Sequence, residues 1–154
     1  MKAWAVLVLA LAVPAAAATQ TAPGVRFDNP KTMPQPRGYT HVVEVSGAHR
    51  VVYISGQLGV EPSGKELASF PEQASQVFEN IKAALESVGG SWANVVKTNT
   101  FLTDIRSQLP ALRSIRDKYV NTNAPPASTT VEVSRLAREG LLIEIEAVAI
   151  LPAK

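Results

Sequence analysis

The sequence contains no cysteine and only two histidines, His41 and His49. Without cysteine the chain can form no disulfide and no thiolate metal site, although an oxidising compartment would not harm it. Two histidines alone make a poor metal cluster, because a protein zinc site takes three or four side-chain ligands. We therefore predict neither a metal nor a cofactor.

The sequence also lacks a strong excess of either charge. Lysine and arginine number 15 against 13 aspartates and glutamates, which gives a formal net charge of +2. Proteins that bind nucleic acid usually neutralise several phosphates with clustered basic side chains. The near balance argues against such a surface, so we predict no nucleic-acid partner and place a ribonuclease activity well behind other functions.

The first eighteen residues have the layout of a secretory signal peptide. Lys2 is followed by an apolar run over 3–13, and Ala15 to Ala18 supply small residues for cleavage before Thr19. The alternative is a membrane anchor, but the run is shorter than the roughly 20 residues that span a bilayer. We predict that 1–18 is a signal peptide, that the protein is exported, in a bacterium to the periplasm, and that it keeps no stable membrane insertion after cleavage.

The remaining chain predicts an extended arm followed by one domain. Residues 19–38 are rich in proline and show no sustained periodicity, whereas 39–154 carry regular apolar patterns. Strands are expected over 39–45 and 50–57 as a hairpin, and then over 94–103, 128–134 and 141–151; helices are expected over 69–88 and 107–120. This ββαβαββ order predicts an α+β fold, a mixed sheet with both helices on one face.

The last predicted strand has two unlike faces. One face is wholly apolar, while the other carries Glu144 and Glu146 among the apolar residues Leu142, Val148 and Ile150. An apolar face that bears acids is awkward for a monomer and favours an oligomer interface or a lined cavity. The plain alternative is a pair of solvated or ion-paired glutamates.

Several blocks of the sequence form a recognisable set. They are Val52-Tyr-Ile-Ser-Gly-Gln57, Val88-Gly-Gly90, Asn94-Val-Val-Lys-Thr98, Phe101-Leu-Thr-Asp104, and the final stretch with Asn123-Ala-Pro-Pro-Ala-Ser128 and Glu144-Ile-Glu-Ala147. Together these blocks resemble the Rid family, the reactive-intermediate deaminases also called L-PSP or RidA-type proteins. The resemblance covers 39–151. It implies a chorismate-mutase-like α+β fold and a homotrimer that binds a small-molecule ligand in three clefts between neighbouring subunits.

The resemblance also implies roles for individual residues. In deaminating members a glutamate matching Glu144 positions or activates the attacking water, a tyrosine matching Tyr39 closes the cleft, and Ser55 and Gly56 lie along its wall. Ordinary structural explanations remain open for each of them. Tyrosine often lies at a wet rim, and a Ser-Gly pair is common in turns and close strand packing.

The sequence departs from the family at one position of consequence. Deaminating members carry an arginine after Pro-Pro-Ala that clamps the carboxylate of a 2-imino acid, and here this position is Ser128. Thr130 adds a hydroxyl but no charge. Arg113 stands where relatives often have asparagine and could supply a displaced cation, or it could be an ordinary exposed helix residue.

These observations give two competing hypotheses about function. The first is an exported trimer that hydrolyses imines or enamines other than the usual 2-imino acids, with Glu144 as the catalytic residue. Its predicted substrate-binding residues are Tyr39, Ser55, Gly56, Arg113, Ser128 and Thr130. The second is a trimer without catalytic activity that acts as a ligand-binding or chaperone-like protein.

Overall fold

The computed structural model describes residues 24–154, so the predicted signal peptide, 1–18, lies outside the described part. The elements follow in the order β1 (Gly24–Asp28), β2 (Val42–Ser46), β3 (His49–Leu58), α1 (Phe70–Ser87), the 3-10 turn η1 (Trp92–Asn94), β4 (Val95–Leu102), α2 (Ile105–Arg116), β5 (Ala127–Glu132) and β6 (Ile143–Pro152). Among the described residues, no helix has the length and apolar character needed to cross a membrane.

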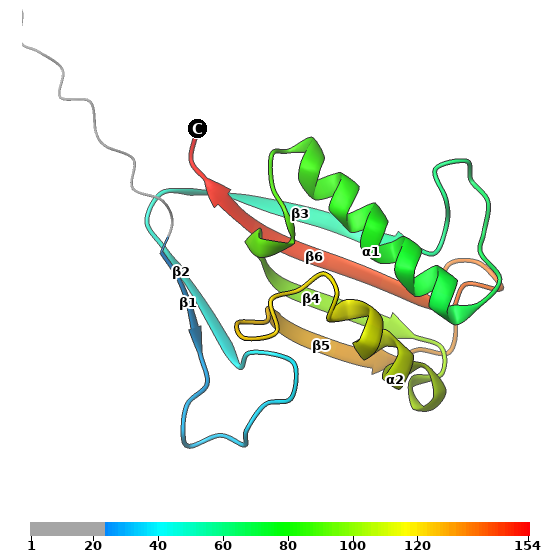
Figure 1. Cartoon of the computed structure of the whole chain (residues 1–154), viewed down its shortest axis with the longest axis horizontal. Helices are drawn as coiled ribbons and strands as arrows, with labels where there is room; N and C mark the ends of the chain where they lie inside the picture. The colour runs from blue at the N-terminus through cyan, green and yellow to red at the C-terminus, as the bar shows by residue number, and fades with distance from the viewer. Residues whose placement is uncertain (1–23) are drawn as a thin grey trace, which may run out of the picture.

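A four-stranded sheet in the order β3-β6-β4-β5 forms the body of the domain. β4 and β5 are parallel, while β6 is antiparallel to both β3 and β4, so the sheet is mixed. Both helices cover the same face of this sheet (Figure 1). The predicted α+β fold class is therefore confirmed.

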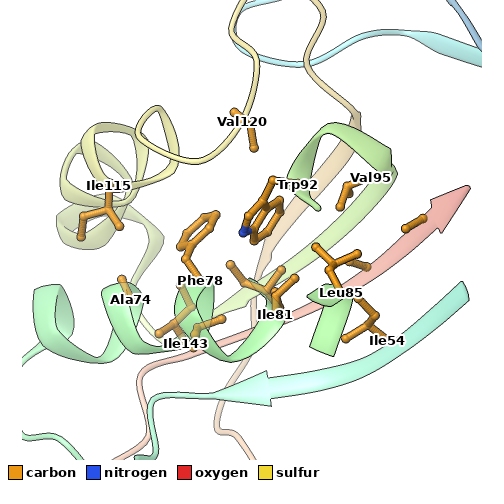
Figure 2. Close-up of a cluster of buried hydrophobic side chains, with 14 of the residues drawn as sticks. Ile54, Ala74, Phe78, Ile81, Leu85, Trp92, Val95, Ile115, Val120 and Ile143 are labelled. Carbon is orange, nitrogen blue, oxygen red and sulfur yellow. The ribbon is translucent and has the colours of Figure 1, made fainter. Parts of the chain in front are cut away.

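The core lies between the two helices and the sheet (Figure 2). β6 supplies one fully apolar face to it, as its alternation predicted. The helices contribute the apolar side chains that recur at helical spacing in the sequence. The buried side chains from β6, α1 and α2 are Ile143, Ile145, Ala147, Ala149 and Leu151, then Ala74, Val77, Phe78, Ile81 and Leu85, and finally Leu112 and Ile115.

Helix α1 begins where the sequence predicts. Ser69 is the N-cap, its hydroxyl accepts from the Glu72 amide, and the Glu72 carboxylate accepts from the Ser69 amide, which completes a capping box. The helix ends at Ser87, and Gly89 follows with a φ of 79°, a left-handed conformation that glycine adopts without steric cost. Local chemistry alone sets both ends.

Helix α2 differs from its predicted bounds at both ends. It starts at Ile105 because the Asp104 side chain accepts from the Ser107 amide and caps the helix earlier than expected. It ends at Arg116, yet Tyr119 still reaches the core and stacks on Phe78 with ring centroids 4.9 Å apart. The tight turns that follow Arg116 keep Tyr119 on the apolar face, so its helical spacing did not require a helix.

The predicted hairpin between 39–45 and 50–57 is wrong in its pairing. The chain does reverse at Gly47, which has a φ of 79°, but β2 pairs with β1 and β3 pairs with β6. β1 lies inside the predicted arm, 19–38, where no strand was expected. Its Val25 and Phe27 lie opposite Val45 and Val43, so the two short strands share an apolar face, and they extend beyond the main sheet (Figure 1).

Candidate functional site

Ser128 and Thr130 lie on the helix-covered face of the sheet. They belong to β5, and the parallel register places them beside Thr98 and Thr100 of β4, both of which are buried. The Thr98 hydroxyl donates to the Ser128 hydroxyl at 3.2 Å. The parallel pairing of β4 with β5 thus gathers four hydroxyl side chains under α2.

A small cavity separates these hydroxyls from α2. Its volume is about 40 Å³, which is room for about three water molecules. No carboxylate lines it. The lining residues are Gly38, Phe78, Trp92, Thr98, Thr100, Leu109, Leu112, Arg113, Arg116, Val120, Pro126, Ser128, Thr130 and Ile145.

Two arginines of α2 border this cavity in different ways. Arg116 is half-buried; its guanidinium donates to the Gly38 carbonyl at 3.0 Å and to Asp117 at 2.6 Å. Arg113 is exposed, and no described residue accepts a hydrogen bond from its guanidinium. Arg116 is therefore occupied in holding the loop before β2, while Arg113 keeps its hydrogen-bonding capacity.

Tyr39 lies next to the same region but does not line the cavity. Its neighbour Thr40 is buried and donates through its hydroxyl to the Pro125 carbonyl at 2.6 Å, which ties this segment to the loop that leads into β5. The Tyr39 ring meets the ring of His41 edge to face, with centroids 5.2 Å apart. Tyr39 is thus held on the Ser128 side of the molecule.

Glu144, Gly56 and Ser55 form a second group on the opposite face of the sheet. Ser55 and Gly56 lie at a bulge where β3 has one residue more than β6 between paired positions. At Gly56 a Cβ atom would overlap Oε1 of Glu144, so the carboxylate rests directly against the glycine backbone. No described residue forms a hydrogen bond with the Glu144 carboxylate, which leaves it available to water or a ligand.

The second glutamate of β6 is engaged differently. Glu146 accepts a hydrogen bond of 2.7 Å from the Asn99 side chain, and Lys97 on the same face donates to Thr129 at 2.8 Å. Glu146 and Lys97 also line an open groove with the exposed ring of Tyr53. Glu144 is therefore the freer of the two carboxylates.

The predicted site residues thus fall into two groups that the sheet separates. Ser128, Thr130 and Arg113 surround the cavity under α2, with Tyr39 nearby, whereas the Glu144 group occupies the uncovered face. A single chain does not bring Glu144 and Ser128 together. Across residues 24–154, no cluster of side chains suited to hold a metal ion is found.

Sequence reasoning missed Trp92 as a member of the cavity, whereas Arg116, like Arg113, was a candidate for a displaced cation and does line it. Trp92 comes from η1, and nothing in the local pattern of that segment marks a site. Thr98 and Thr100 were likewise missed. Their relation to Ser128 depends on the parallel register of β4 and β5, which joins strands on either side of α2.

Comparison with known families and proteins shows which family the chain belongs to. A model of the family described as Endoribonuclease L-PSP matches residues 31–151 and so begins within the predicted arm, before residue 39. A RutC family protein of Aquifex aeolicus is 37% identical over 119 residues, which are 76% of this chain and 92% of that protein. This protein therefore belongs to the Rid family.

Two further relatives bear on fold and activity. A Rid-family protein of Yersinia pestis, YyfB, whose function is unknown, superposes with a TM-score of 0.72 at 31% identity over 82% of this chain and 98% of its own. Human 2-iminobutanoate/2-iminopropanoate deaminase is 40% identical over 103 residues, 66% of this chain and 73% of the human protein. The first supports the fold across the domain, and the second is a relative named as a deaminase of 2-iminobutanoate and 2-iminopropanoate.

Proposed function

We propose that this protein is a homotrimer that hydrolyses small imines or enamines in clefts between its subunits. One subunit supplies Glu144, Ser55 and Gly56, and its neighbour supplies Tyr39, Ser128, Thr130 and Arg113. The observation that carries the proposal is the division of these residues between opposite faces of one sheet. Within one chain the sheet keeps Glu144 away from the hydroxyl-lined cavity, and a second copy could bring its own Glu144 there. The human relative's name, an imine deaminase, agrees with this chemistry.

Exposed apolar side chains on the uncovered face support association. Val51 is 43% exposed, Tyr53 is 80% exposed and Val131 is 40% exposed, and all three lie on the strands of the main sheet. Side chains of this kind gathered on one sheet face mark a surface that a partner covers. A neighbouring copy seated there would also cover the Glu144 group.

Glu144 is the catalytic base in this proposal. It takes a proton from water as the water oxygen forms a bond to the carbon of a protonated imine. Glu144 returns that proton to the carbinolamine nitrogen, and the C–N bond then breaks with its electron pair leaving on nitrogen as ammonia. Glu144 takes the proton that the hydroxyl group loses as the carbonyl forms and passes it to the ammonia. Protonated imine and water thus become a carbonyl compound and ammonium, and no cofactor is required.

Ser128 determines which imines are poor substrates. A serine hydroxyl cannot form the bidentate charged contact by which an arginine grips a carboxylate, and loss of such a contact typically costs about 2–5 kcal/mol of binding. We therefore propose that the usual 2-imino acids are not the substrates of this protein.

A gain of function tests the proposal. 2-Imino acids are generated in situ from amino acids, and their hydrolysis is measured for the wild type, Ser128→Arg and the double variant Ser128→Arg with Glu144→Ala. The wild type should be nearly inactive, and Ser128→Arg should gain about tenfold or more, since about 1.4 kcal/mol of regained binding suffices. Glu144→Ala should abolish that gain.

The control is Ser114→Arg, which adds the same charge at an exposed position of α2 that lies outside the cavity. It should leave hydrolysis unchanged. A wild type that processes 2-imino acids as fast as arginine-bearing relatives would contradict the role given to Ser128. A gain in Ser128→Arg that survives Glu144→Ala would contradict the role of Glu144.

A ligand-binding trimer without catalytic activity is the second candidate. The absence of the family's arginine at Ser128 is the observation that favours it. This candidate predicts that neither the wild type nor Ser128→Arg turns over any imine, although both remain folded and associated. The same assay therefore separates the two functions.

A further inference from the structure

We propose that His41 is a positioning residue, which holds the Tyr39 ring at the edge of the proposed cleft. This inference rests on the proposed function, because it concerns how one of the substrate-binding residues named there is kept in place. His41 does not line the cavity under α2, so its effect on a ligand passes through Tyr39. His41 therefore acts without touching the ligand.

Tyr39 lies near the end of a long connection between β1 and β2. Residues 29–41 contain no helix or strand, and a loop of this length has many conformations of similar free energy unless specific contacts fix it. The backbone is fixed on both sides of Tyr39. The Thr40 hydroxyl donates to the Pro125 carbonyl, and an arginine of α2 donates to the Gly38 carbonyl. Neither bond restrains the Tyr39 ring.

His41 closes this loop on itself through two hydrogen bonds. Its backbone amide donates to the side-chain oxygen of Asn29 at 2.9 Å, and its ring Nε2 lies 2.8 Å from the Pro34 carbonyl oxygen. Because a carbonyl oxygen can only accept, Nε2 carries a proton and donates it. The bond to Asn29 holds the backbone and the bond to Pro34 holds the ring, so the imidazole has a defined orientation.

The imidazole of His41 supports the Tyr39 ring directly. The two ring centroids lie 5.2 Å apart and the planes meet at 85°, an edge-to-face arrangement that aromatic rings favour. This is the one aromatic contact of Tyr39 among residues 24–154. The Tyr39 side chain is half-buried, and no described residue forms a hydrogen bond with its hydroxyl. His41 thus restricts the ring and leaves the hydroxyl free for a ligand.

A ring held in this way lowers the free energy that a ligand must supply to order it. If Tyr39 contacts the ligand in the ground state and the transition state alike, its loss of order should raise KM and leave kcat nearly unchanged. A purely structural defect would instead reduce the Tm and the folded fraction, and KM would stay the same.

Three substitutions of His41, made in the Ser128→Arg variant and assayed with 2-imino acids, separate its two contacts. His41→Ala removes both and should raise KM about tenfold, with kcat within about twofold. His41→Phe keeps a ring beside Tyr39 and should recover much of that loss, to within about threefold of the parent KM. His41→Gln can still donate to Pro34 but has no ring, so its KM should stay near that of His41→Ala.

The second histidine supplies the matched control. His49 also bonds to a backbone carbonyl through its ring, since its Nδ1 lies 2.7 Å from the Gly47 carbonyl oxygen in the turn between β2 and β3. It neither lines the cavity nor contacts the Tyr39 ring. His49→Ala should leave KM unchanged.

NMR of the otherwise unaltered protein tests the contact without any turnover. The ring protons of Tyr39, identified by their loss in Tyr39→Phe, should show a nuclear Overhauser effect to the His41 ring. Their chemical shifts should move toward those of an unstructured tyrosine in His41→Ala and in His41→Gln. They should stay in place in His49→Ala.

The outcomes distinguish this inference from the proposed function. No Overhauser effect between the rings, Tyr39 shifts that ignore His41→Ala, an equal response to His49→Ala, or full recovery of KM in His41→Gln would each overturn it. If the NMR results are as expected but no imine is hydrolysed, the proposed enzyme activity fails and the positioning role stands. If imines are hydrolysed while KM and the Tyr39 resonances ignore every His41 variant, the positioning role fails and the activity stands.

Discussion

Glu144 and Gly56 act as a unit because the carboxylate lies where any side chain at position 56 would begin. The bulge in β3 brings the glycine backbone over β6, and a Cβ atom at Gly56 would overlap Oε1 of Glu144. The glycine is required here by close approach. Its role is thus to leave space for a carboxylate that no described residue restrains.

Gly56→Ala should therefore impair activity more than stability. The new methyl group meets the far end of a flexible side chain, so Glu144 can rotate away without disturbing the core. We expect hydrolysis by the Ser128→Arg variant to fall about tenfold to a hundredfold, because a displaced base no longer reaches the water. Turnover and the Tm, measured together, decide this.

Gly90→Ala is the matched control. A Cβ atom at Gly90 would lie 3.3 Å from a methyl group of Leu151, a contact that small shifts relieve, and Gly90 neither lines the cavity under α2 nor lies against Glu144. It should leave turnover unchanged. A loss of turnover in Gly90→Ala equal to that in Gly56→Ala would show that any alanine in this fold is harmful and would remove the special role of Gly56.

At the scale of single elements, the start of α1 is specified by a local motif, the capping box of Ser69 and Glu72. Hydrogen bonds from the Ser69 hydroxyl, and then from the Ser69 amide, lower the pKa of the Glu72 carboxyl below its ordinary value of 4.5. Because the pKa is lowered in the folded state, the stabilising contribution is complete above pH 4.5 and is lost as the pH falls through the folded value.

Ser69→Ala should lower the Tm at pH 7 by roughly 2–6 °C, since it removes the N-cap hydroxyl. The same variant should raise the pKa of Glu72 toward 4.5, as measured by NMR titration of its carboxyl carbon. The difference in Tm between wild type and variant should shrink below pH 4.5. Ser75→Ala, within the same helix, should show neither effect, and a similar pKa change there would contradict the capping-box explanation.

The pairing of strands with one another places more of the site residues than the local structure of any single element does. The turn at Gly47 was readable from the sequence, but the partners of β2 and β3 were not, because each pairing depends on which apolar strands compete for the same edge. Ser128 and Thr130 were identified by resemblance to a family motif. Their threonine neighbours on β4 were not, since parallel pairing across α2 leaves no local signal.

At the scale of the whole molecule, the main sheet has an apolar face that residues 24–154 leave uncovered. We expect a homotrimer, with a mass three times that of its single chain, in multi-angle light scattering at micromolar concentration. Val51→Asp should shift the protein toward monomers, because it places a charge on the proposed interface. Such a monomer would also lose the complete cleft and any imine hydrolysis.

Val42→Asp is the control for this experiment. Val42 is 42% exposed, nearly equal to Val51 at 43%. It belongs to the β1–β2 pair, where the ion pair of Arg26 with Glu44 marks a solvated face. This variant should remain trimeric. A wild type that elutes as a monomer, or dissociation of both variants alike, would contradict the proposed interface.

Export is the second property that belongs to the whole chain. The composition of residues 1–18 predicts removal of the signal peptide before Thr19. Intact mass spectrometry of protein from the exported fraction of expressing cells should give a chain that begins at Thr19. Recovery of a chain that still begins at Met1 would contradict the prediction, and retention of that chain in the membrane fraction would favour the anchor.

The sequence by itself determined the parts that rest on local chemistry and periodicity. It predicted the α+β class, the capped start of α1 and the two unlike faces of β6, because caps and alternation act between residues close in the chain. Resemblance to the family added two residues: Ser128, which stands where deaminating members have arginine, and Glu144, which matches their glutamate.

Only the tertiary structure decided how these residues are distributed in space. The sheet separates Glu144 from Ser128, the parallel pairing of β4 with β5 gathers the hydroxyls, and the packing of η1 and α2 brings Trp92 and Arg113 to one cavity. Each of these contacts joins segments far apart in the chain. Their free energy depends on how competing strands and helices pack, and that competition leaves no trace in any single stretch of sequence.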